Sequence, residues 1–182
     1  GRPIPPLSST TVDRAFEHRL GGTLYHIRAP LSEFDERRCQ SRWAANVAAH
    51  LHRLQLLGQL WDDRLPPPLV YKGADIAEHL FDDPGARQAA DLDLLVPEAF
   101  FDQARARLES NADMIIEADH ERWPWEPAAG LGFRIGPVLI ELHRDPQPRH
   151  RRRYSGGAVY GRGAPAQLGG LDIRVPCPTD RI

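Results

Sequence analysis

Apolar residues first recur with a helical period over residues 35–63. They stand at steps of three and four residues, which is typical of one face of an amphipathic helix. That face would carry Trp43, Val47, Leu51, Leu54, Gly58 and Trp61. The prolines at positions 66–68 cannot continue a helix. The pattern therefore predicts one long amphipathic helix from Asp35 to about Asp63.

Short apolar runs bounded by turn residues follow, and they predict strands separated by helices. The run PLVYKG precedes a helical pattern, and the run DLDLLV precedes another, with Pro97 at its start. The apolar stripe of this second helix would be Phe100, Phe101, Ala104 and Leu108. Three further runs, DMIIEAD, GLGFRIG and PVLIELH, also indicate strands, and QLGGLDIRVP indicates a single last one.

This order of elements predicts an α+β fold, with a mixed β-sheet that helices cover mainly on one face. The long amphipathic helix would precede the sheet. We expect residues 1–34 to form an N-terminal extension, with a short helix in TVDRAFEHRL and a strand in TLYHIRA. Residues 35–182 would form the main domain.

Composition narrows the class of protein without pointing to a ligand. Apolar residues make up 41% and charged residues 26% of the 182 residues, as in ordinary globular proteins. A net charge of −2 gives no general attraction to nucleic acid. The two cysteines are too few for a disulfide framework or a structural zinc site. Without an apolar run of membrane-spanning length, we expect a cytoplasmic protein with no membrane partner.

Acidic residues alternate with apolar ones in two of the expected strands. Asp91 and Asp93 would share one face of their strand, and Glu141 and His143 one face of theirs. Buried carboxylates without partners are costly, so this pattern needs a compensating cation. If the two strands are neighbours, Asp91, Asp93 and Glu141 converge as hard oxygen ligands for Mg²⁺.

The turn after the first strand has features of a phosphate site. Gly73 allows a ligand to approach the backbone closely, and the start of the following helix offers free N–H groups. Lys72 would add a point charge, and Arg87 a planar fork for phosphate oxygens.

The ordered set of Lys-Gly, an Arg before Asp-x-Asp-x-Leu-Val, and Glu-x-His resembles the uncharacterised nucleotidyltransferase family. This family lies within the superfamily of DNA polymerase β-like nucleotidyltransferases, and the resemblance covers roughly residues 40–180. It implies transfer of a nucleoside monophosphate from a nucleoside triphosphate (NTP), such as ATP, to a hydroxyl-bearing acceptor. Asp91, Asp93 and Glu141 would be the catalytic and metal-binding residues for Mg²⁺ or Mn²⁺. Lys72, Gly73, Arg87 and His143 would bind the nucleotide.

The chain departs from the resemblance in two respects. The wider superfamily usually has Gly-Ser or Gly-Gly in the phosphate loop, whereas this chain has Lys72-Gly73-Ala74 and so lacks a loop hydroxyl. Members of the close family also continue into a helical region, so we expect the chain to be truncated before it. The acceptor stays open between a small molecule, peptide, protein and RNA, as do the preferred base and the oligomeric state.

Several alternatives stay open at this point. The fold could serve a non-catalytic nucleotide-sensing or partner-binding domain, and Asp-x-Asp also occurs in sugar-nucleotide glycosyltransferases, which need a longer chain. Lys72 and Arg87 could serve only as counter-ions of the carboxylates. Two further segments have weaker claims to phosphate or base binding: Arg149–Tyr154, and the tryptophans Trp123 and Trp125.

Overall fold

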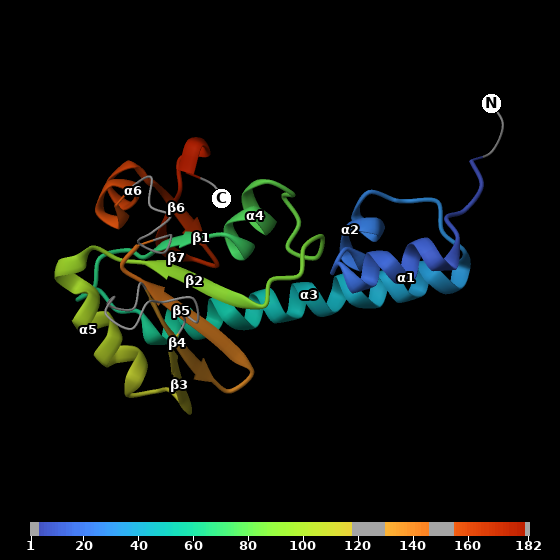
Figure 1. The fold of residues 1–182 in the computed structure, drawn as a ribbon. Coiled ribbons are helices and arrows are strands. Elements are labelled where there is room, and N and C mark those ends of the chain that lie inside the picture. The colour runs from blue at the N-terminus through green and yellow to red at the C-terminus, as the bar shows by residue number, and fades with distance from the viewer. Residues whose placement is uncertain (1–3, 118–129, 146–154, 181–182) are drawn as a thin grey trace. The chain divides into compact units, whose positions relative to one another are not determined.

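The computed structural model describes residues 4–117, 130–145 and 155–180 (Figure 1). The chain forms two compact units. The first contains residues 1–52 and 73–89, and the second residues 53–72 and 90–182. The division expected from the sequence, an extension over 1–34 and a domain over 35–182, stays a prediction.

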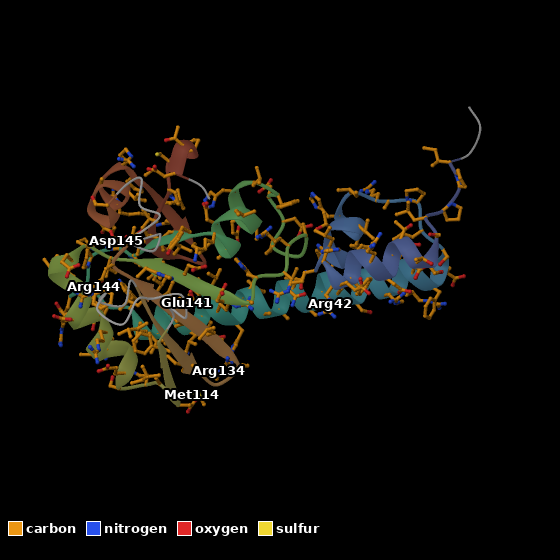
Figure 2. All side chains as sticks on the ribbon, viewed as in Figure 1. Arg42, Met114, Arg134, Glu141, Arg144 and Asp145 are labelled. Carbon is orange, nitrogen blue, oxygen red and sulfur yellow. The ribbon has the colours of Figure 1, made fainter. Side chains whose placement is uncertain are left out.

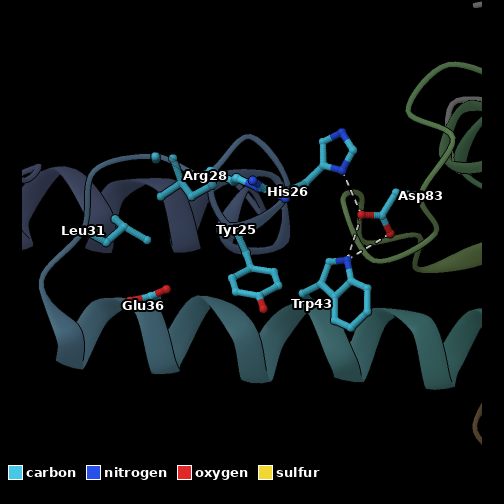
Figure 3. A pocket seen from close by; sticks show the side chains of 9 residues that line it. Tyr25, His26, Arg28, Leu31, Glu36, Trp43 and Asp83 are labelled. Carbon is cyan, nitrogen blue, oxygen red and sulfur yellow. Dashed lines mark hydrogen bonds and ion pairs between the residues drawn. The ribbon is translucent and has the colours of Figure 1, made fainter.

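The first unit is helical. It contains α1 (Ser9–Glu17), α2 (Gly21–His26), the first part of α3 (Glu33–Leu60) and α4 (Gly73–His79). The Asp83 carboxylate connects several segments of this unit. Its two oxygen atoms accept hydrogen bonds from Trp43 Nε1 at 2.8 and 2.9 Å. His26 Nδ1 lies 2.8 Å from the same carboxylate. Beside this junction is a pocket of about 530 Å³, which Tyr25, Arg28 and Glu36 also line (Figure 3).

The strand expected in TLYHIRA is wrong, because most of this segment lies in the short helix α2. Its β-branched and aromatic residues favour a strand only as a local preference. In the folded unit they make contacts that require the helix. Thr23 Oγ1 donates a 2.6 Å hydrogen bond to the carbonyl oxygen of Ala86, and the Tyr25 ring packs 5.7 Å from that of Trp43. Tertiary packing thus overrides local propensity.

The long helix α3 is confirmed, and its expected apolar face is confirmed only in part. Leu54 and the adjoining Trp61 are buried, but Leu51 is 57% exposed and Gly58 is exposed. The buried residues of the helix include Asp35, Asn46 and His50. Each has a hydrogen-bond partner; the side-chain amide of Asn46, for example, donates to the carbonyl oxygen of Gly85 at 2.9 Å. Satisfied polar residues can be buried at little cost, and a search for apolar residues misses them.

The second unit contains a mixed sheet, as the sequence predicts, and this sheet has seven strands. Its strand order is β3-β4-β5-β2-β1-β7-β6. β2 pairs in parallel with β5, and β1 with β7, while the other neighbours are antiparallel. The strands are β1 (Leu69–Tyr71), β2 (Asp91–Leu95), β3 (Met114–Glu117), β4 (Gly130–Ile135), β5 (Val138–His143), β6 (Ala164–Leu168) and β7 (Leu171–Val175).

Alternation in β2 and β5 separates the main core from the face that carries the acidic residues. Leu92, Leu94, Ile140 and Leu142 are fully buried on one face. The helix α5 (Glu98–Glu109) contributes buried residues to this unit, among them Phe101 and Leu108. Phe100, which the sequence also placed on the apolar stripe of α5, is 36% exposed.

The C-terminal part of the sheet is a hairpin rather than the single strand expected in QLGGLDIRVP. Gly169 and Gly170 both have positive φ, at 59° and 83°, and they join β6 to β7. Two consecutive residues with positive φ are what a tight two-residue hairpin turn requires. The segment before the hairpin forms α6 (Gly156–Arg162), which sequence reasoning missed. A Cβ atom at Gly156 would lie 1.8 Å from the carbonyl oxygen of Arg144, so glycine is needed there.

Among the described residues, no helix is both long and apolar enough to cross a membrane.

A pair of glycine substitutions tests the packing of α2. A Cβ atom at Gly22 would lie 2.1 Å from the backbone oxygen of Gly85 and 2.7 Å from the side-chain nitrogen of Asn46. We expect Gly22→Ala to lower the free energy of unfolding by about 2 kcal/mol or more, because it forces these groups apart. The control is Gly58→Ala, in an exposed helical position with no atom within 4 Å. It should stabilise by about 0.5–1 kcal/mol.

Both variants are measured by urea denaturation. Equal stability of Gly22→Ala and the parent protein would contradict the close approach of α2 to the Gly85 backbone.

Candidate functional site

The parallel pairing of β2 with β5 brings the acidic residues together. Asp93 lies opposite Glu141, Asp91 opposite Leu139, and Leu95 opposite His143. Paired residues in neighbouring strands point to the same side of a sheet, so Asp91, Asp93, Glu141 and His143 share one face. Figure 2 shows Glu141 on β5, with Arg144 and Asp145 just beyond the end of the strand.

Three of these side chains form a tight group, which we call the acidic cluster: Asp93, Glu141 and His143. The Nε2 atom of His143 lies 3.3 Å from Asp93 Oδ1 and 3.2 Å from Glu141 Oε2. One ligand atom from each residue lies within 4.8 Å of the others, a spacing that suits a single metal ion. Asp91 shares the face but is not a member of this group.

Lys72 provides the cation that the buried carboxylate needs. Its Nζ atom lies 2.6 Å from Asp93 Oδ1, and the Asp93 side chain is only 2% exposed. The Lys72 backbone has a φ of 58°, a left-handed conformation that usually favours glycine. Such strain persists where the surrounding structure holds it, often at functional sites. Here the Lys72 side chain compensates the charge of Asp93, and the backbone of Lys72 is strained.

Partners of opposite charge set the protonation states of the acidic cluster. Burial opposes ionisation of Asp93, but hydrogen bonds from His143 and Lys72 and the Lys72 charge outweigh it and hold the pKa of Asp93 below its usual value. Burial likewise opposes protonation of His143, yet its bonds to Asp93 and Glu141 raise the pKa of the imidazole. The charged form of Asp93 and the protonated form of His143 therefore stabilise each other.

Asp91 has the opposite electrostatic environment. Burial, together with the negative charges of Asp93 and Glu141, raises its pKa, and the charge of Lys72 offsets this only in part. The guanidinium of Arg53 is close enough to Asp91 for the carboxylate to raise its pKa, although burial lowers the pKa of Arg53 overall. The ionised form of Asp91 is thus less well compensated than that of Asp93.

Tyr71 is a member of this face that sequence reasoning missed. It pairs with Asp93 across β1 and β2, and its ring packs edge-on against the His143 ring at 5.6 Å. On its other side the imidazole lies against Gly130, where a Cβ atom would come within 2.6 Å of Nδ1. Tyr71 and Gly130 together fix the orientation of His143. Alternation in β1 could have placed Tyr71 on the face of Asp93. An aromatic residue in a short apolar strand, however, is usually assigned to the core.

The other expected nucleotide-binding residues lie in the first compact unit. Gly73 begins α4 and is buried; a Cβ atom there would meet the Ala89 side chain at 2.9 Å, which gives this glycine a packing role. Arg87 is exposed, and its guanidinium makes no ion pair within the described residues. Their contacts with phosphate stay predictions. Trp123, Trp125 and Arg149–Tyr154 lie outside the described residues.

The chemistry of the donor set is compatible with a divalent cation. The carboxylates of Asp93 and Glu141 are the hard ligands that Mg²⁺ and Mn²⁺ prefer, and Asp91 adds a third on the same face. A histidine suits Mn²⁺ better than Mg²⁺. Any cation bound by Asp93 competes with Lys72 for the Oδ1 atom, since the ammonium group already lies there.

Comparison with known families identifies the chain. The sequence model of a family described as uncharacterised nucleotidyltransferase matches residues 10–182. The chain therefore belongs to the uncharacterised nucleotidyltransferase family, as its motifs indicated. Neither the curated proteins nor the solved structures include a match.

Two neighbouring aspartates should respond oppositely to neutralisation. The folded-state pKa of Asp91 is raised, so its contribution to stability is present below about pH 4 and is lost as the pH rises through that pKa. Asp91→Asn should therefore raise the melting temperature at pH 7 relative to the parent, but not at pH 3. The pKa of Asp93 is lowered, so its contribution is present above about pH 4 and is lost as the pH falls.

Asp93→Asn should accordingly lower stability at pH 7 by about 1–3 kcal/mol, because it leaves Lys72 and His143 without their shared anion. The stability of both variants is measured by thermal denaturation in the presence of a chelator. Each variant serves as the matched control of the other. A gain in stability for Asp93→Asn would contradict the ion pair. It would instead indicate that repulsion between the carboxylates dominates here.

A second pair of variants separates the charge of Lys72 from its backbone strain. Lys72→Met removes the ion pair but keeps a side chain, and so the strain, at positive φ. Lys72→Gly removes the ion pair and the backbone strain together. We expect both variants to be less stable than the parent, Lys72→Met by about 1–3 kcal/mol. Lys72→Gly should be the more stable variant by about 1 kcal/mol. If urea denaturation found Lys72→Met as stable as the parent, Lys72 would not be the counter-ion of Asp93.

Proposed function

We propose that the chain is an Mg²⁺- or Mn²⁺-dependent nucleotidyltransferase that transfers a nucleoside monophosphate from an NTP to a hydroxyl-bearing acceptor. The observation that carries this proposal is the pairing of β2 with β5, which sets Asp93 beside Glu141 with Asp91 on the same face. Membership in the family is consistent with this chemistry.

The acidic residues would have the central role. Asp91, Asp93 and Glu141 would hold the divalent cations, which stabilise charge on the phosphoryl oxygens and favour deprotonation of the acceptor hydroxyl. The Nε2 atom of His143 contacts the carboxylates of both Asp93 and Glu141. Its edge-on contact with Tyr71 limits how far the imidazole can turn.

Lys72 would exchange partners when substrate binds. Its ammonium group is bound to Asp93, and 38% of its side chain is exposed. A lysine released from Asp93 would carry its charge on a flexible stem toward the triphosphate. Without a loop hydroxyl, the triphosphate would depend on Lys72, on Arg87 and on backbone N–H groups near Gly73.

One observation favours a second candidate, a nucleotide-sensing or partner-binding domain without turnover. The 2.6 Å ion pair occupies Asp93, the residue that would be needed most for catalysis. The phosphate loop also lacks its usual hydroxyl. If the ion pair persists when nucleotide is bound, Asp93 cannot serve a metal through that oxygen.

Turnover distinguishes the two candidates. With α-³²P-labelled NTPs, Mn²⁺ or Mg²⁺ and a cell extract as the source of acceptor, the parent protein should release pyrophosphate and label an acceptor. Glu141→Gln should reduce the rate at least 100-fold, since it removes a charged ligand at the reacting phosphate. The control is Glu109→Gln, at a half-buried position on α5 whose carboxylate pairs with Arg105. Nucleotide binding without pyrophosphate release by the parent would favour the sensing domain.

A further inference from the structure

The hydroxyl group of Tyr71 is buried and lacks a hydrogen-bond partner among the described residues. The residue is only 3% exposed, so water does not satisfy the group at the protein surface. Buried hydroxyl groups in folded proteins nearly always have a partner, and a group without one destabilises the fold. Phenylalanine would fill the same space without this penalty. The hydroxyl therefore needs an explanation beyond packing.

The contrast with Tyr160 sharpens the point. Tyr160 packs against the same small apolar group, formed by Leu69, Tyr71, Leu95 and Val159. Its hydroxyl donates a 2.8 Å hydrogen bond to the carbonyl oxygen of Pro67. The fold thus provides an acceptor for one tyrosine at this position and none for its neighbour.

The surroundings of the Tyr71 ring place it at the acidic cluster. The ring packs edge-on against His143, and Lys72 Nζ lies 5.0 Å from the centre of the ring. Burial and then the charge of Asp93, followed by those of Glu141 and Asp91, hold the pKa of the phenol well above its usual value. The hydroxyl accordingly keeps its proton and remains a donor.

We propose that the Tyr71 hydroxyl is a ligand-binding group, which donates a hydrogen bond to an oxygen atom of the species that the acidic cluster binds. This inference rests on the proposed function. The oxygen belongs either to a phosphate of the nucleotide or to a water molecule on the bound cation; both are acceptors of the same kind. The unsatisfied donor lowers the stability of the free protein and increases the affinity of the site.

The test compares Tyr71→Phe with the parent and with Tyr160→Phe. In the presence of a chelator, Tyr71→Phe should melt at the same temperature as the parent or higher, because it removes an unsatisfied donor. Tyr160→Phe should melt lower, since it loses a satisfied bond. Affinities are then measured by calorimetry for Mn²⁺ alone, and for the non-hydrolysable α,β-methylene analogues of ATP and GTP with Mg²⁺. Tyr71→Phe should bind an analogue about 10-fold more weakly, and Tyr160→Phe within twofold of the parent.

The two ligands distinguish the source of the oxygen. Weaker binding of the analogues alone assigns the bond to a phosphate, and weaker binding of Mn²⁺ as well assigns it to water on the cation. Unchanged affinity for both ligands would overturn the inference, as would a loss of fold or a lower melting temperature in Tyr71→Phe, which would make the hydroxyl structural. If the parent itself bound neither ligand, the proposed function would fail, and this inference with it.

Discussion

The Asp93 carboxylate is buried in the middle of the sheet, and the arrangement of the site follows from the need to compensate its charge. Two groups meet that need: Lys72 at 2.6 Å and His143 at 3.3 Å from the same oxygen. For Lys72 to reach it, the backbone adopts a positive φ directly after β1. For His143 to reach it, β5 must pair with β2 in parallel and in a register that places Glu141 opposite Asp93. A shift by one residue would turn Glu141 to the opposite face.

Much of the arrangement of the site could be predicted from the sequence, because alternate residues of a strand point to the same face of the sheet. Two aspartates separated by one leucine must share a face of a strand, and so must Glu141 and His143. The sequence does not state which strands are neighbours, but buried charge restricts the choice, since isolated carboxylates would be too costly. The role of Lys72 was less determined. The sequence allowed both a phosphate ligand and a counter-ion, and in the structure the lysine pairs with Asp93.

The errors have a common physical cause, which is that polar contacts distant in sequence decide what is buried. Asn46 and His50 lie on the buried face of α3 because the carbonyl oxygen of Gly85 and the carboxylate of Glu78 bind them. The spacing of apolar residues in the sequence gives no indication of these polar contacts. The α2 segment is helical for the same reason, because Thr23 donates its hydrogen bond to Ala86, 63 positions away in the sequence. Tyr71 was missed for the opposite reason. Its place in a short apolar strand indicates a core residue, and the sequence does not show that its hydroxyl lacks a partner among the described residues.

The two aspartates of β2 also bear on the choice between catalysis and sensing. At Asp93 the negative charge is compensated, and the pKa of this carboxyl is lowered. At Asp91 burial and the neighbouring carboxylates raise the pKa, so the charged form is less favoured there than in a free aspartate. Opposed shifts of two acidic groups in one site are typical of functional groups. A domain that had lost its need for divalent cations would gain stability by replacing Asp91 with a neutral residue. The presence of a carboxylate at this position therefore favours a site that binds cations.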